Sequence, residues 1–359
     1  MSIKVFRNTK IYVVAPANTF TGGPELLHQI VYHLRSDLNI DAFMYYYPSN
    51  NIIDPIHPAL KDYENPFVRK VEDKKENLII VPEIINGIKF LKYFNNIKKA
   101  IWWLSVDNFY LSFIFHSKKN LFLPRAINKL TFLIFRKKIF DITSLVYKKL
   151  EKNQLDLNEF KTIRDTDYHL VQSYYAMKYL EEKGIEKNKL FYLSDYLNEK
   201  FLTVQTDLSH KQNIVVYNPS KGYNFTKKII KRTKDIEFIP IINMTRQQVI
   251  EALQKAKVYI DFGNHPGKDR IPKEAAILGC CVITGKRGSA AFYEDVPIPE
   301  EYKFDERDEN IPEIINKIRD CFENFDERYK DFDHYREVIK NEPQKFVEDL
   351  KKIFVKAEN

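Results

Sequence analysis

The stretch VYIDFGNHPGKDRIPKEAAILGCCVIT, residues 258–284, predicts a strand, a polar loop, a helix and a second strand in that order. VYID and CCVIT are short apolar runs typical of buried strands, and KEAAILG between them is rich in helix-forming residues. The loop GNHPGKDR combines glycines, a proline, a histidine and charged side chains, a composition that a hydrophobic core does not use. This arrangement indicates an α/β fold with a functional loop at the end of a strand.

The same alternation continues on both sides of this stretch. Toward the N-terminus, helical patterns separate apolar runs that predict strands at residues 10–18, 41–47, 77–84 and 99–105. A second series is expected to begin near residue 165, with a strand–helix unit followed by five more apolar runs. Because repeated strand–helix units build parallel sheets, we expect two Rossmann-like domains that face each other across a cleft.

We place the boundary of these two domains in the polar stretch around residue 160. Residues 1–160 are expected to form the N-terminal domain, and residues 161–342 the C-terminal domain. The tail at 343–359 has apolar residues at helical spacing, so we expect a helix there that packs back on the N-terminal domain.

Composition fits a cytoplasmic globular protein. The chain of 359 residues is 44% hydrophobic and 30% charged, which excludes a disordered polymer. Its three cysteines cannot make a disulfide framework, and the charged N-terminus does not resemble a signal peptide. No apolar run approaches the roughly 20 residues that a membrane-spanning helix requires.

Positive charge concentrates at residues 111–153. This segment has ten lysines and arginines against two acidic residues, a net charge of +8 that equals the total for the chain, together with six phenylalanines. Such a basic, aromatic stretch suits the inner face of the plasma membrane, where the protein would bind peripherally to anionic headgroups. The alternative is a pair of core helices with solvated lysine faces. Because no nucleic-acid module is recognisable, we expect no nucleic-acid partner.

A glycine turn follows the first predicted strand. Gly22 and Gly23 permit close approach of the backbone to a ligand, and the helix that follows offers N-terminal amides that favour phosphate. Glu25 lies in the first turn of that helix and is a candidate catalytic base. The alternative is a turn that merely requires glycine.

Polar residues also follow the strand at 99–105. The indole of Trp103 can stack on a sugar ring, and Ser105 and Asn108 are expected to contact the same molecule. Asp107, at the strand end, is a second candidate base. A structural tryptophan pair followed by a helix-capping aspartate is the alternative.

In the second half, anion-binding residues follow three predicted strands. Lys221 in NPSKG can neutralise a diphosphate, although the spacing is not that of a P-loop. His265 and Arg270 can hold phosphates, and Glu274 can accept hydrogen bonds from a ribose diol. The full set expected to bind this ligand is Asn218, Ser220, Lys221, Gly263, His265, Arg270, Glu274, Arg287 and Ser289.

Metal ligation and cofactors are not expected. The eight histidines are scattered, and neither HExxH nor CxxC occurs. A D-T-D triplet occurs only at residues 165–167, at the predicted domain boundary.

Together these motifs resemble the GT-B glycosyltransferases of the group 1 (glycosyltransferase family 4-like) superfamily. The resemblance rests on GG-P-E before the first helix, K-G after a second-half strand, and KEAAILGCCVIT. In that family a glutamate, two small residues and Gly-x-x-Val-Ile open the helix of the nucleotide-sugar pocket. The matching residues here are Glu274, Ala275, Ala276, Gly279, Val282 and Ile283.

The resemblance implies that Glu274 holds the donor ribose, that Lys221 holds its diphosphate, and that the loop of Gly22 and Gly23 approaches the donor. Many retaining members carry an earlier glutamate, separated from the second by seven residues, and Pro266 occupies that position here, beside His265. The stereochemistry therefore stays open. An inverting enzyme would use Asp107 or Glu25 as base, whereas in a retaining one the donor phosphate would assist.

The resemblance thus implies a metal-independent glycosyltransferase of surface polysaccharide biosynthesis. It would move a sugar from a nucleotide-sugar to a glycan or lipid-linked glycan bound by the N-terminal domain, with His265 as a third candidate catalytic residue. A GT-B-fold nucleotide-sugar epimerase and a non-catalytic nucleotide- or glycan-binding module are the alternatives.

Overall fold

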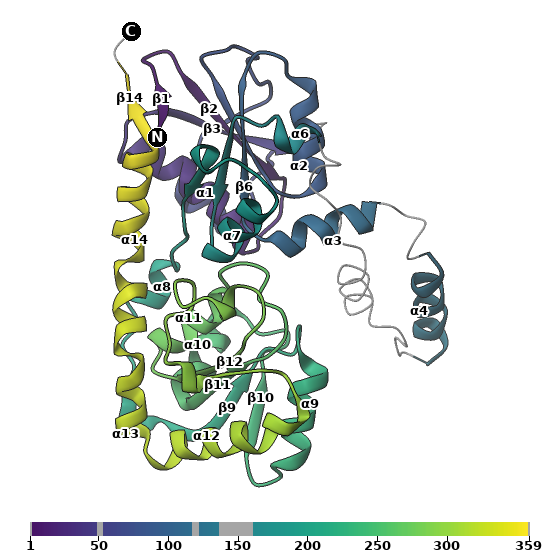
Figure 1. Ribbon diagram of the computed structural model, residues 1–359, viewed down its shortest axis with the longest axis vertical. Helices are drawn as coiled ribbons and strands as arrows, with labels where there is room; N and C mark the ends of the chain where they lie inside the picture. The colour runs from purple at the N-terminus through teal and green to yellow at the C-terminus, as the bar shows by residue number, and fades with distance from the viewer. Residues whose placement is uncertain (1, 49–52, 117–121, 136–160, 358–359) are drawn as a thin grey trace. The chain divides into compact units, whose positions relative to one another are not determined.

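Two parallel β-sheets, each flanked by helices, organise the computed structural model of this chain (Figure 1). The structure describes residues 2–48, 53–116, 122–135 and 161–357. The chain forms two compact units. The first is Met1–Gln172 with Ala176–Tyr192 and Leu350–Asn359, and the second is Ser173–Tyr175 with Leu193–Asp349. Among the described residues, no helix is both long and apolar enough to cross a bilayer.

The first unit contains a seven-stranded sheet in the order β4-β3-β2-β5-β6-β7-β8, in which every neighbouring pair is parallel. Its strands are β2 (Lys10–Pro16), β3 (Asp41–Tyr47), β4 (Phe67–Val68), β5 (Leu78–Pro82), β6 (Lys98–Trp103), β7 (Tyr168–Val171) and β8 (Leu190–Tyr192). The helices are α1 (Gly22–Ser36), α2 (Ile85–Phe90), α3 (Val106–His116), α4 (Phe122–Phe135), α6 (Lys161–Arg164) and α7 (Tyr174–Glu182). The central strands are buried, as apolar runs in a parallel sheet require.

The second unit contains a five-stranded parallel sheet in the order β10-β9-β11-β12-β13. Its strands are β9 (Gln212–Tyr217), β10 (Glu237–Pro240), β11 (Ala256–Asp261), β12 (Cys281–Gly285) and β13 (Lys303–Phe304). The helices are α8 (Glu199–Leu202), α9 (Tyr223–Arg232), α10 (Arg246–Lys255), α11 (Arg270–Ile277), α12 (Ile311–Glu323), α13 (Phe325–Arg328) and α14 (Asp333–Ile353). The opening stretch thus forms β11, a loop, α11 and β12, in the predicted order.

The division of the chain falls later than the expected boundary at residue 160. β7 pairs with β6, and β8 pairs with β7, so the strand–helix unit at 168–192 completes the first sheet instead of beginning the second. The apolar runs of these strands predict that they are buried, but not which sheet they join. Only the ladder between β6 and β7 decides this.

The C-terminal tail also differs from the expected helix at 343–359. α14 begins at Asp333 and contains Pro343 in its interior, and it ends at Ile353. Phe354–Lys356 then form a short strand, β14, which pairs in parallel with β1 (Ile3–Val5) in the first unit (Figure 1). The tail therefore reaches the first unit through backbone hydrogen bonds of a strand as well as through a helix.

Candidate active site

Two glycines bring two loops of the second unit together, backbone against backbone. Gly222 is the N-cap of α9 with φ +61°, and Gly263 follows β11 with φ +105°, both in the left-handed region. A Cβ on Gly222 would lie 1.9 Å from the carbonyl oxygen of Phe262, and one on Gly263 would lie 2.5 Å from the amide nitrogen of Gly222. These contacts explain both glycines and place the loops after β9 and β11 side by side.

Lys221 lies at this junction between two carboxylates. Its Nζ is 3.5 Å from Oδ2 of Asp261 and forms a closer ion pair with Asp269. Burial alone would lower the pKa of Lys221, but the two carboxylates outweigh this effect and raise it. Burial alone would raise the pKa of Asp269, and here Lys221 and then His265 outweigh it and lower the pKa. The pair is therefore charged at neutral pH.

His265 is enclosed in the same cluster. Its side chain is fully buried, with Nδ1 2.8 Å from Oδ2 of Asp269 and Nε2 3.2 Å from the carbonyl oxygen of Asp261. Its backbone carbonyl accepts from the amide of Ser289, and a Cβ on Gly288 would lie 2.0 Å from that oxygen. The expectation that His265 contacts a phosphate or acts as a catalytic residue is wrong for this conformation, because the imidazole supports Asp269 instead.

Asp261, His265 and Asp269 are also residue types that bind metals, and their ligand atoms lie within 4.8 Å of one another. The ammonium of Lys221 lies beside two of these side chains and offsets one of their two negative charges. Metal independence stays a prediction.

The N-terminus of α11 starts beside this cluster. Asp269 is its N-cap, but the carboxylate makes no capping hydrogen bond because it turns toward Lys221. Arg270 opens the helix, with Nε 3.9 Å from Oδ2 of Asp195, and Glu274 follows one turn later with a half-buried side chain. A helix N-terminus next to Lys221 and Arg270 is a favourable place for phosphate.

Four other residues expected to bind the donor differ in burial and in hydrogen bonding. Ser289 is fully buried and donates from Oγ to the carbonyl of Gly267 at 2.6 Å, so its hydroxyl holds the loop and the predicted ligand contact is wrong. Asn218 closes a turn by accepting from the amide of Ser220, whose side chain is exposed. The side chain of Arg287 is 43% exposed at the same edge, with its guanidinium 3.8 Å from Glu306.

In the first unit, Gly22 and Gly23 begin α1. A Cβ on Gly23 would lie 3.5 Å from Cδ1 of Leu104, an ordinary contact, so packing does not require glycine there. Glu25 is 2% exposed, and Tyr63 donates to its Oε1 at 3.4 Å. Glu25 therefore lies buried beside Tyr63 instead of at an open surface.

Trp103 is fully buried, and the prediction that it stacks on a sugar is wrong. Its indole nitrogen donates to Nδ1 of His169 at 3.1 Å, and its ring packs edge-on against Phe109. β6 is an interior strand of the sheet, so Trp102 and Trp103 point to opposite faces and both fill core. The alternative expectation, that Trp102 and Trp103 are structural, is confirmed.

The polar candidates after β6 differ in exposure, and only Asn108 lies at the surface. Ser105 accepts from the amide of Asn108 at 3.0 Å and thereby caps α3, and its ligand contact stays a prediction. Asp107 is 7% exposed in the first turn of α3, and Asn108 is exposed. These two side chains remain candidates for the acceptor.

Solved structures resemble the whole chain. HepE of Anabaena in complex with UDP-glucose aligns over 96% of this chain and 100% of its own, with a TM-score of 0.55 and 11% identity. HepE with UDP and glucose aligns over the same shares, with a TM-score of 0.56 and 10% identity. The apo form of the lipopolysaccharide outer core galactosyltransferase WaaB aligns over 96% of this chain and 99% of its own, with a TM-score of 0.50 and 11% identity.

The chain has the GT-B fold. No protein-family model and no curated protein matches its sequence. At these identities the likeness to solved structures establishes the architecture alone, as the two parallel sheets led us to expect.

Sequence reasoning missed one carboxylate that holds the loops after β11 and β12 together. Glu306, just after β13, accepts from the amide of Gly263 at 2.6 Å, and its other oxygen lies 3.8 Å from Arg287. It therefore ties the loop after β11 to the loop after β12. Its sequence context, an acidic stretch at 305–309, looks like a solvated surface and contains no signal of this role.

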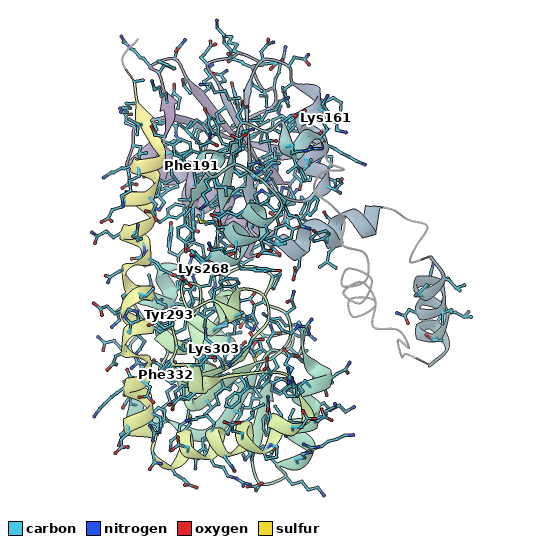
Figure 2. All side chains as sticks on the ribbon, viewed as in Figure 1. Lys161, Phe191, Lys268, Tyr293, Lys303 and Phe332 are labelled. Carbon is cyan, nitrogen blue, oxygen red and sulfur yellow. The ribbon has the colours of Figure 1, made fainter. Side chains whose placement is uncertain are left out.

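A buried charge network behind α11 was also missed. Nζ of Lys273 is 2.8 Å from Asp195 and 2.9 Å from Glu342, and its side chain is 1% exposed. Lys268, labelled in Figure 2, donates to Ser194 and lies 3.5 Å from Glu342. The network fixes α11 against segments 78 residues earlier and 69 residues later in the chain, which no local pattern can predict.

Proposed function

We propose that the protein is a glycosyltransferase that uses a nucleotide-sugar donor. The observation that supports this most is the junction of Gly222 and Gly263. It places Lys221 beside the N-terminus of α11, where Arg270 and Glu274 follow. This is the carboxyl edge of the sheet, where doubly wound folds bind nucleotides. HepE has the same fold and is described in complex with UDP-glucose, which supports a uridine nucleotide as the first donor to test.

The chemistry follows from the charges at this edge. Breaking the bond between the sugar and the diphosphate leaves negative charge on the departing phosphate. Cations and helix N–H groups that are already in place stabilise that charge without reorganising. The cations at this edge that could stabilise the departing phosphate are Lys221, Arg270 and Arg287. We therefore propose a reaction that needs no metal. Glu274 would hold the ribose diol.

The acceptor would bind to the first unit, at the first turns of α1 and α3, which carry Gly23, Glu25, Asp107 and Asn108. We propose a glycan or lipid-linked glycan of surface polysaccharide biosynthesis as its class. Asp107 and Glu25 are the candidate bases for an inverting reaction. In a retaining reaction the same side chains would orient the acceptor hydroxyl.

Donor binding gives the first prediction. We expect UDP to raise the melting temperature of the full chain, because a ligand at 100 times its Kd stabilises the native state by about 2.7 kcal/mol. Glu274→Ala removes a carboxylate that hydrogen-bonds the ribose, so UDP affinity should fall by about tenfold or more. Thermal shift with UDP, GDP, ADP and CDP, followed by calorimetry, measures both.

Glu313→Ala is the matched control, because Glu313 is an exposed residue of α12. It should bind UDP like the unmodified protein. No stabilisation by any of the four nucleotides would contradict the proposed function. Turnover of UDP-glucose to another UDP-sugar without acceptor would identify an epimerase instead.

We further propose that the protein works at the cytoplasmic face of a membrane and binds it through part of segment 111–153. On α4, Leu123, Leu130 and Leu133 are 68%, 59% and 64% exposed, and their spacing of seven and three residues places them on one helix face. Residues 117–121 and 136–160 lie outside the described residues. The positive charge of the segment favours anionic lipid beside this leucine face.

Membrane binding gives the second prediction. The protein should float with vesicles that contain phosphatidylglycerol, and high salt should release most of it because headgroup attraction is screened. Leu130→Asp should weaken binding at low salt, whereas Tyr293→Asp, at an exposed aromatic residue of the second unit, should not. Equal partition into neutral phosphatidylcholine vesicles, or no flotation at all, would contradict this proposal.

A further inference from the structure

A buried carboxyl that the sequence analysis did not single out lies at the acceptor side of the first unit. Glu83 follows β5 directly, and its side chain is 2% exposed. Its Oε2 accepts from the amide of Leu104 at 3.2 Å, and its own amide donates to the carbonyl of Trp102 at 3.2 Å. Glu83 therefore ties the exit of β5 to the exit of β6.

No cation neutralises this carboxyl within the described part of the chain, where Glu83 forms no ion pair. Burial raises the pKa of Glu83 to about 8, although the amides of Glu83, Leu104 and Ser105 act in the opposite direction. At neutral pH most molecules thus hold the carboxyl protonated. A protonated carboxyl can still accept from the amide of Leu104, and it avoids an uncompensated buried charge.

The titratable neighbour of Glu83 is Tyr47, at the end of β3. Tyr45 stacks on Phe90 of α2, and because strand residues alternate, Tyr47 points to that same face of the sheet. Burial and, after it, the charge of Glu83 raise the pKa of Tyr47 to about 12. Glu25 on α1 and Asp107 on α3 are the acidic groups of the helices that adjoin this edge. Of the cationic side chains on these helices, Lys89 of α2 is exposed and His28 of α1 is hydrogen-bonded to Tyr46, and neither forms an ion pair with Glu83 in the described part of the chain.

The loop that Glu83 holds connects the candidate acceptor residues. Leu104 directly precedes Ser105, which caps α3, and Asp107 is in the first turn of that helix. The side chain of Leu104 also lies 3.5 Å from where a Cβ on Gly23 would be. A shift of the Leu104 amide would therefore move Asp107 and alter the contact with the glycine loop.

We propose that Glu83, in its protonated form, is a positioning residue that fixes the loop between β6 and α3 and so places Asp107 for the acceptor. The proposal rests on the proposed function, since Asp107 acts on an acceptor only if the protein transfers a sugar. Ionisation of Glu83 puts an uncompensated charge in the core, and hydration of that charge opens the loop. Activity and loop protection should then fall together as the pH rises through about 8.

Hydrogen exchange in the full chain tests the structural half. The amides of Leu104 and Ser105 should lose about tenfold or more of their protection between pH 7 and pH 9, after correction for intrinsic exchange. Glu83→Gln, an isosteric mimic of the protonated carboxyl, should keep that protection at both pH values. Glu182→Gln, at an exposed residue of α7, is the matched control and should behave like the unmodified protein.

Turnover of UDP-glucose tests the functional half. The rate should fall above pH 8 in the unmodified protein and in Glu182→Gln, but not in Glu83→Gln. A purely structural role would change stability without removing this alkaline limb. If the amide of Leu104 keeps the same protection from exchange at pH 7 and pH 9 in the unmodified protein, the proposal is overturned, even if Glu83→Gln does not fold. A folded Glu83→Gln whose rate still falls above pH 8 would overturn it as well. Absence of UDP binding would contradict the proposed function, and the exchange result would still decide whether Glu83 holds the loop.

Discussion

Gly222→Ala is expected to destabilise the second unit by roughly 3–5 kcal/mol, a loss reserved for named structural faults. The φ of +61° alone costs an alanine about 1 kcal/mol. The larger part comes from the Cβ, which would lie 1.9 Å from the carbonyl oxygen of Phe262, an atom of the facing backbone that cannot rotate away. Urea unfolding followed by circular dichroism measures the change in free energy.

Gly184→Ala is the matched control. Gly184 has a φ of +79°, and a Cβ there would meet no atom within 4 Å, so the substitution carries the backbone strain without the steric clash. It should cost only about 1 kcal/mol. Equal effects of the two substitutions would mean that the loops after β9 and β11 are not held backbone to backbone. We also expect Gly222→Ala to abolish the stabilisation by UDP, because the junction places Lys221.

The second large effect is expected for Lys221→Met. The substitution leaves the carboxylates of Asp261 and Asp269 without their cation, and because the pair is partly buried we expect a cost of about 3 kcal/mol, the lower end of the range for buried pairs. Lys228→Met is the control, because Lys228 pairs with Asp308 at an exposed site, where ion pairs contribute little. Thermal and urea unfolding at pH 7 compare the two variants.

The stability lost in Lys221→Met should depend on pH, because it depends on the ionisation of Asp269. Because its pKa is lowered in the folded state, the pair contributes stability above the unfolded pKa of about 4, and this contribution is lost as the pH falls through the lower folded value. The difference between Lys221→Met and the unmodified protein should therefore shrink below pH 4. A difference that stays constant down to pH 2 would contradict the assignment of Lys221 as the partner of Asp269.

Nucleotide binding separates the structural role of Lys221 from its proposed role at the diphosphate. Lys221→Met should lose UDP binding, whereas Lys228→Met should retain it. Asp269→Asn removes the carboxylate that competes for the ammonium, so we expect it to bind UDP at least as tightly as the unmodified protein. Weaker binding in Asp269→Asn would mean that the Lys221–Asp269 pair must stay intact in the complex.

Local sequence patterns predicted strands correctly where a strand is one continuous apolar run. Residues 41–47 and the segment at 258–284 form the strands and the helix that the sequence indicates. The same reasoning failed for Trp103, because the sequence around an aromatic residue at a strand end is the same whether a helix buries that residue or leaves it exposed. It failed for His265 and Ser289 because a polar side chain next to a ligand loop can equally hold that loop together.

The sequence by itself determined the α/β class, the order of strands and helices, and the polar loops at the carboxyl ends of β9, β11 and β12. These depend on interactions between residues close along the chain, which periodicity and turn chemistry record. Only the tertiary structure decided that β7 and β8 belong to the first sheet, that Lys221 is paired with Asp269, and that Lys273 and Glu83 are buried. These features depend on partners far apart in the chain, and the physical reason is burial: a carboxyl or an ammonium acquires its charge state and role from the groups that replace water around it.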